Sequence, residues 1–150
     1  MPYRLISAQM LLEHEVIARL SDALRTVIGS ASHGDQSRKL ASLRLLAESF
    51  QRHLERMLEL EEHGGYMDLV QTSYPAYQPQ IALFRREHDE LRDTSQELGQ
   101  RLDAANLPQE AEIEPLFAAL LALLENVESH NNRERELLQE IIAQHHPEGA

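Results

Sequence analysis

The sequence of 150 residues contains no cysteine. A chain without thiols forms no disulfide, no thiolate metal site and no iron–sulfur cluster, and it has no cysteine nucleophile. Any metal that this protein binds must therefore be held by nitrogen and oxygen donors. The absence of cysteine by itself leaves the redox compartment open.

Basic residues are also scarce: 14 Lys and Arg stand against 25 Asp and Glu, which gives a formal net charge of -11. This imbalance disfavours long-range attraction to nucleic acid or to an anionic membrane, so we expect neither as a partner. Small cations suit the acidic chain better. The N-terminal segment has no apolar run long enough for a signal peptide core or a membrane span, and we expect a cytoplasmic protein.

Glycine and proline are few, six of each, and most fall between four long stretches of helical periodicity. These stretches cover residues 5–28, 36–63, 79–104 and 109–144. Gly64 and Gly65 are expected to end the second helix, and the segment from there to Pro79 is expected to be a connection. Because no strand pattern is present, we predict an all-α protein, an antiparallel up-down-up-down four-helix bundle forming a single domain over residues 1–150.

Each predicted helix carries a histidine or a glutamate on the apolar stripe that should face the core. These residues are His14, Glu61 and His88 on the first three helices, with His130 and Glu134 on the fourth. A buried carboxylate without a partner costs several kcal/mol, and no Lys or Arg falls on these stripes, so a bound cation is the simplest counter-charge. His130 and Glu134 share one helical face, and imidazole and carboxylate are ligands for iron, manganese and zinc.

The segments around these residues resemble the four helices of a hemerythrin-like (HHE) domain. The matching segments are LLEHEVIARL around His14, MLELEEHGGYMDLV around Glu61, FRREHDELR around His88 and SHNNRERELLQE around His130. They follow the family's order over nearly the whole chain. The resemblance implies a non-haem di-iron centre held by His14, Glu61, His88, His130 and Glu134, in which the two glutamates bridge the irons.

One position departs from the family pattern. Four residues before Glu61 the family has a histidine, and this sequence has Met57. A thioether is a soft ligand that suits iron poorly, so His53 is the substitute ligand to consider. His53 lies one turn before Met57, about 6 Å along the helix axis, so a role beside the site is also open. We therefore expect an asymmetric centre with two unlike irons, or a single iron, manganese or zinc ion.

Two neighbours of these residues are interpreted as structural. Glu62 points about 100° away from Glu61 around the helix, which predicts a solvated surface charge. Tyr66, which follows the two glycines, is predicted to pack beneath the end of the bundle.

The favoured function is a binding or sensing protein whose non-haem iron takes dioxygen or a related small ligand such as peroxide or nitric oxide. A second hypothesis is a di-iron or manganese oxidase or peroxidase, for which the missing histidine would leave an open coordination position. A third is a four-helix interaction module with a degenerate or mononuclear metal site. Binding or sensing is preferred because the resemblance implies it for this set of five ligands, and no substrate pocket can be identified from these residues.

Overall fold

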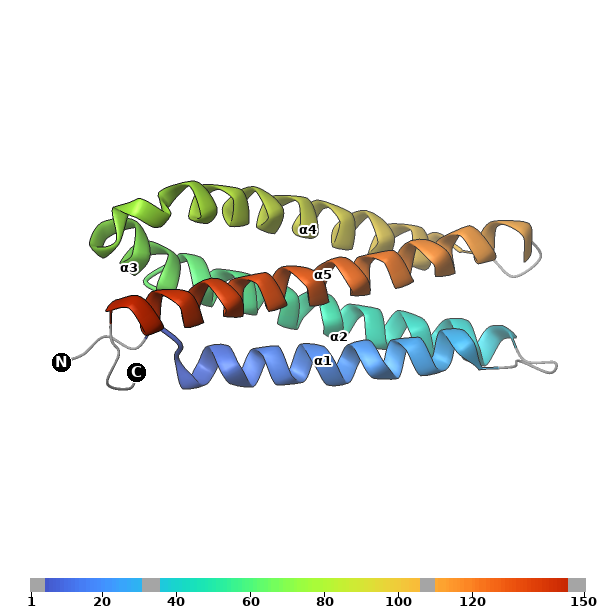
Figure 1. Cartoon of the computed structure of the whole chain (residues 1–150). Helices are drawn as coiled ribbons and strands as arrows, with labels where there is room; N and C mark the ends of the chain where they lie inside the picture. Colours follow the sequence, from blue (N-terminus) through green and yellow to red (C-terminus); the bar gives the residue numbers. More distant parts are fainter. Residues whose placement is uncertain (1–4, 31–35, 106–109, 146–150) are drawn as a thin grey trace.

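The computed structural model describes residues 5–30, 36–105 and 110–145, the first three of the last range by their backbone alone. Four long helices make up most of the structure (Figure 1). They are α1 (Ala8–Gly29), α2 (Gln36–Glu62), α4 (Gln78–Ala104) and α5 (Glu110–His145). A short helix α3 (Tyr66–Ser73) and a 3₁₀ turn η1 (Pro75–Tyr77) join α2 to α4. Within the described ranges there is no strand, so the predicted all-α four-helix bundle is confirmed.

The four long helices form a closed ring in which α1 packs on α2, α2 on α4, α4 on α5 and α5 on α1. In Figure 1 the chain leaves the left end along α1 and returns along α2. It then leads away again along α4 and comes back along α5. The start of α1, the end of α5 and the whole of α3 therefore lie at the same end of the bundle.

The connection after α2 differs from the expectation. Gly64 has a φ of 72°, a left-handed conformation that ends α2 as predicted. A Cβ on Gly65 would stand 2.0 Å from the carbonyl oxygen of Leu60, so only glycine fits there. Beyond the glycines the segment expected to be a plain connection contains α3 and η1. The chain becomes helical there because Met67 and Val70 can then bury their side chains against the bundle end.

Two apolar clusters fill the interior, with a polar band between them. On α1, Met10 belongs to the cluster at the α3 end and Ile17 to the other, larger cluster. On α4 the same division falls between Phe84 and Leu91. His14 lies between the first pair of residues and His88 between the second, so the polar side chains are enclosed by an apolar layer on either side.

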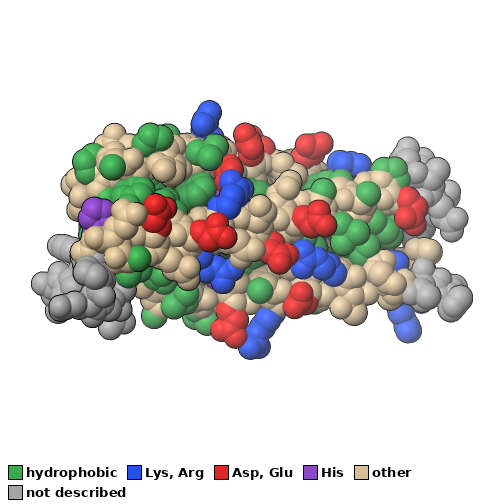
Figure 2. All heavy atoms as spheres, in the orientation of Figure 1, with side chains coloured by type: hydrophobic (Ala, Val, Ile, Leu, Met, Phe, Trp, Pro, Cys, Tyr) green, Lys and Arg blue, Asp and Glu red, His purple; other side chains and the backbone are tan. Residues whose placement is uncertain are grey.

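The outer surface carries charges of both signs. In the view of Figure 2, red and blue side chains are interspersed along the visible face and do not separate into patches of one sign. No helix among the described residues combines the length and the apolar character needed to cross a membrane.

Candidate metal centre

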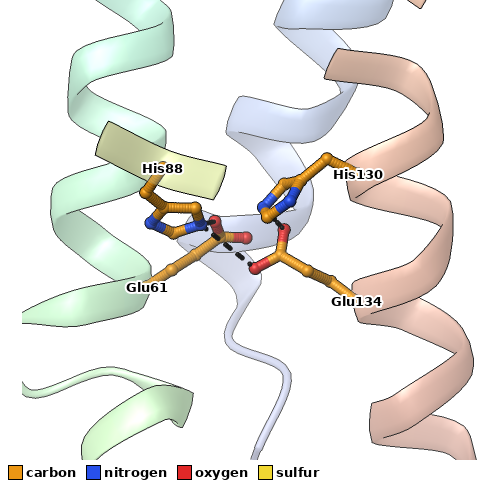
Figure 3. Close-up of side chains that lie close together, drawn as sticks. All are labelled: Glu61, His88, His130 and Glu134. Carbon is orange, nitrogen blue, oxygen red and sulfur yellow. Dashed lines mark ion pairs between the residues drawn. The ribbon is translucent and has the colours of Figure 1, made fainter. Parts of the chain in front are cut away.

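Four buried side chains from three helices meet in the polar band (Figure 3). Glu61 comes from α2, His88 from α4, and His130 and Glu134 from α5. Each offers one ligand atom, and these atoms all lie within 4.8 Å of one another. None of the four side chains is more than 1 % exposed. The predicted ligands on the second, third and fourth helices are thus brought together by the fold.

The distances within this cluster are short. Nε2 of His88 lies 3.3 Å from Oε1 of Glu61 and 3.4 Å from Oε2 of Glu134. Nε2 of His130 lies 3.0 Å from Oε1 of Glu134. Two imidazole nitrogens and two carboxylates therefore surround one point from different sides, which is the arrangement that a small cation needs.

The cluster fits a metal ion because its inward atoms lack hydrogen-bond partners. In the described part of the chain, Nε2 of both histidines and Oε1 of both glutamates are buried and make no hydrogen bond. Buried polar atoms are nearly always paired, and each unpaired one costs stability. Four such atoms facing one another form a group that could hold a cation between them.

His14 reaches Glu61 from α1, and Met57 lies one turn before Glu61 on α2. Nε2 of His14 is 2.9 Å from Oε2 of Glu61, and the His14 side chain is buried. His14 does not belong to the compact group of four, although it contacts one of its carboxylates. Met57 is fully buried, and Nδ2 of Asn131 lies 3.7 Å from its sulfur. The position where the family pattern has a histidine is therefore occupied by a packed thioether.

His53 lies outside the cluster. Its Nδ1 is 2.9 Å from Oε2 of Glu13, and its side chain is 30 % exposed. Glu13 is itself buried and also lies 3.6 Å from Arg56. Because one turn of α2 separates His53 from Met57, the His53 ring reaches α1 near the surface. There it is already paired with the carboxylate of Glu13. The structure thus places the suggested substitute ligand in a separate ion-pair network.

The family model for the hemerythrin HHE cation binding domain matches residues 5–142. The chain belongs to this family. No curated protein and no solved structure matches the chain. The match includes α1 to α4 and all but the last three residues of α5, so the four residues of the cluster all lie within the hemerythrin-like domain.

The carboxylates of this hemerythrin-like domain control the protonation of its histidines. Although burial opposes it, the nearby carboxylates of Glu134 and Glu61 raise the pKa of His88 to about 10. Burial alone would lower the pKa of His130, but the carboxylates of Glu134 and Glu87 raise it. Burial alone would raise the pKa of Glu134, but the two histidines lower it. Without metal the cluster therefore holds protons, and a metal must displace them to bind.

His88 is oriented by a second glutamate, Glu62. The outer nitrogen of the ring, Nδ1, lies 2.7 Å from Oε2 of Glu62, and Arg92 holds both oxygens of this carboxylate at 2.8 Å. Glu62 was predicted to be a solvated surface charge, and that interpretation is wrong. The angle from Glu61 directs its side chain toward α4, where His88 and Arg92 enclose it and leave it 9 % exposed.

His130 is oriented in the same way by Glu87. Nδ1 of His130 lies 2.7 Å from Oε1 of Glu87, whose other oxygen accepts a hydrogen bond from Arg133 at 2.6 Å. Burial would raise the pKa of Glu87, but the Arg133 and His130 contacts lower it. A carboxylate on Nδ1 fixes the ring and directs Nε2 inward, as is usual for histidine ligands of metals. Glu87 was not among the residues predicted for the site from the sequence.

Tyr66 has a contact beyond the packing predicted for it. Its ring is buried at the bundle end, and its hydroxyl donates a hydrogen bond to Oε2 of Glu134. Burial, together with the charges of Glu134 and Glu61, raises the pKa of Tyr66 well above its ordinary value. The phenol therefore stays protonated and holds one oxygen of Glu134 in place, while the other faces His130.

Proposed function

We propose that the chain acts in the cytoplasm as a single hemerythrin-like domain that holds non-haem iron and binds or senses dioxygen or a related small oxidant. The observation that carries this proposal is the set of four buried donor atoms without hydrogen-bond partners in the cluster of Glu61, His88, His130 and Glu134. Membership of a cation-binding family supports it. Manganese and zinc share these ligands and are tested alongside iron.

The donor set favours one strong metal position and one weak one. The strong position has two imidazoles and two carboxylates, enough for a stable ion with a coordination site left open for a small ligand. The weak position has His14 and the outer oxygen of Glu61, but Met57 supplies no nitrogen there. We infer that a second iron binds more weakly than the first or is absent.

The residues around the cluster suit it to a small ligand. Bound iron supplies an electron-rich centre to which dioxygen, peroxide or nitric oxide can attach. The chain's own contribution is to orient the ligand atoms through Glu62, Glu87 and Tyr66 and to exclude water with apolar layers on both sides. A dry, preorganised site favours reversible binding over loss of the metal to solvent.

Metal content and thermal stability test the first part of the proposal. Protein purified without chelator is expected to contain iron, and Fe(II), Mn(II) or Zn(II) added to stripped protein should raise its melting temperature. Anaerobic Fe(II) protein should then change its absorption spectrum on exposure to dioxygen or nitric oxide. Absence of any thermal shift at saturating metal would reject the proposal in favour of an interaction module with a degenerate site.

A second candidate function is an oxidase or peroxidase, which the buried Met57 favours because it leaves the second position short of a ligand. Steady consumption of peroxide together with a reducing substrate, absent from metal-stripped protein, would establish turnover. Reversible spectral change without net consumption would instead establish a carrier or sensor.

A further inference from the structure

A cavity of about 440 Å³ lies between α1 and α5, beside the metal centre. Its volume is far greater than a diatomic ligand needs and lies within the range of pockets that hold small organic molecules. It forms where α1 and α5 face each other, the loosest of the four contacts between neighbouring long helices. The cavity therefore has the size for a ligand of several heavy atoms.

The inner end of the cavity is polar. His14 and Asn131 line it, and both side chains are more than nine-tenths buried. Nδ1 of His14 and Oδ1 of Asn131 make no hydrogen bond with any described residue. The amide of Asn131 is otherwise engaged only through its Nδ2, which contacts the sulfur of Met57. Two buried polar atoms thus lack the partner that a ligand in the cavity could provide.

The walls of the cavity are apolar, and its mouth carries charges of both signs. Ile17 and Val127 contribute buried apolar surface. At the mouth, Arg25 lies 3.1 Å from Glu128, and Arg135 donates a hydrogen bond to Asn132 at 2.6 Å. Arg25 is paired with a carboxylate and Arg135 with a neutral amide, and the acidic Glu15 and Asp22 also line the cavity. Such a mouth does not select for an anion or a cation, so it favours a neutral ligand.

We propose that this cavity binds a small neutral organic molecule that has an apolar body and a hydroxyl group. The body fits against Ile17 and Val127, and the hydroxyl reaches the inner end, where it bonds to Asn131 and His14. A hydroxyl suits this pair because it both donates and accepts, and so serves either tautomer of the imidazole. A charged group would instead be buried without a counter-charge, at a cost of several kcal/mol.

The same residues connect the cavity to the metal centre. His14 contacts Glu61 on its other side, and Asn131 follows His130 along α5. A molecule seated in the cavity would therefore lie next to the cluster while leaving its four ligands undisturbed. Its binding needs no metal, so the cavity proposal and the metal proposal stand or fall separately.

Phenol is a suitable probe because it is neutral at pH 7 and matches the proposed chemistry. We would titrate phenol into the full chain, metal-free and zinc-loaded, and follow binding by calorimetry and NMR. Zinc is used because it does not oxidise the probe. Ala18 is exposed on the cavity wall and is none of the four clustered ligands, so Ala18→Phe fills the space while leaving those four side chains in place. Ala82, exposed on α4 away from the cavity, provides the matched control Ala82→Phe.

The expected result is saturable binding of phenol to the wild type and to Ala82→Phe, and its loss in Ala18→Phe. Replacing the amide in Asn131→Leu should weaken the binding of phenol about 2- to 10-fold. The binding of benzene, which lacks the hydroxyl, should be unaffected. Equal phenol affinity in Ala18→Phe and the wild type would overturn the proposal, as would no binding to the wild type. Zinc content, measured in each variant, reports separately on the metal centre.

Discussion

Nε2 of His130 lies 3.0 Å from Oε1 of Glu134, one turn further along α5. Both atoms are buried, and neither makes a hydrogen bond in the described structure. Two donors fixed on one face of a helix keep their separation without depending on a loop, so this half of the centre is preformed. Any metal in the cluster is therefore expected to be anchored first by α5.

Removing this anchor should abolish metal binding. His130→Ala deletes one of the two imidazoles of the cluster. After stripping, reloading with iron and dialysis, we expect this variant to retain less than about a tenth of the wild-type iron, measured by atomic emission. His53→Ala is the matched histidine variant, because His53 is paired with Glu13 outside the cluster. It should keep the full metal content. Equal loss in both variants would return His53 to the ligand set.

Restoring the missing histidine should raise the number of bound metals. Met57 is fully buried one turn before Glu61, and His14 faces the same carboxylate. We expect Met57→His to supply the second nitrogen that the weak position lacks, and so to move the stoichiometry of tightly bound iron from one per chain toward two. Metal analysis and anomalous scattering from crystals would count the ions.

Met57→Leu is the control for this change, since it keeps the volume and removes the thioether at a cost below about 1.5 kcal/mol. It should bind the same amount of iron as the wild type. Two tightly bound irons in the wild type itself, equally present in Met57→Leu, would contradict the asymmetry inferred for the centre.

Glu87 should tune metal affinity without being a ligand. Glu87→Gln keeps an oxygen for Nδ1 of His130 but removes the charge, so we expect metal to bind about 10-fold more weakly. Competition with a chelator of known affinity measures the change. Glu136→Gln, at an exposed position of α5, alters the net charge equally and should leave affinity unchanged. Equal weakening in both variants would show a general effect of charge.

Sequence periodicity was sufficient to predict the bundle, because helices that bury one apolar stripe have few ways to pack. The same stripes predicted that Glu61, His88, His130 and Glu134 would face the interior, since a polar residue at a core position is conspicuous. His14 also faces inward, although it contacts Glu61 from outside the group of four.

The supporting residues could not be predicted in the same way. Glu62 and Glu87 lie beside the stripes, where a carboxylate normally faces water, and nothing in the periodicity distinguishes them from surface acids. Their enclosure depends on which helices are neighbours and on arginines from the neighbouring helix, Arg92 for Glu62 and Arg133 for Glu87. Helix α3 was missed because its eight residues show too short a periodic pattern to separate them from a connection.

The stability of the metal-free protein should depend on the proton carried by His88. Its pKa is raised from the ordinary 6.5 to about 10 in the folded protein, so the folded state binds this proton more tightly than the unfolded state. The resulting stabilisation is fully present below pH 6.5 and is lost as pH rises toward 10. We therefore expect the melting temperature of metal-free protein to fall between pH 7 and pH 10.

The zinc-loaded protein should lose less stability over this interval, because the metal replaces the proton on the ring. Other groups also titrate near pH 10, and the variant His88→Gln serves as the control for them. It has no proton to lose at this position, so its melting temperature, metal-free, should fall less steeply than that of the wild type. Calorimetry of the three samples across the interval makes the comparison. An equally steep fall in metal-free His88→Gln would contradict the assignment, since the lost proton would then belong to another group.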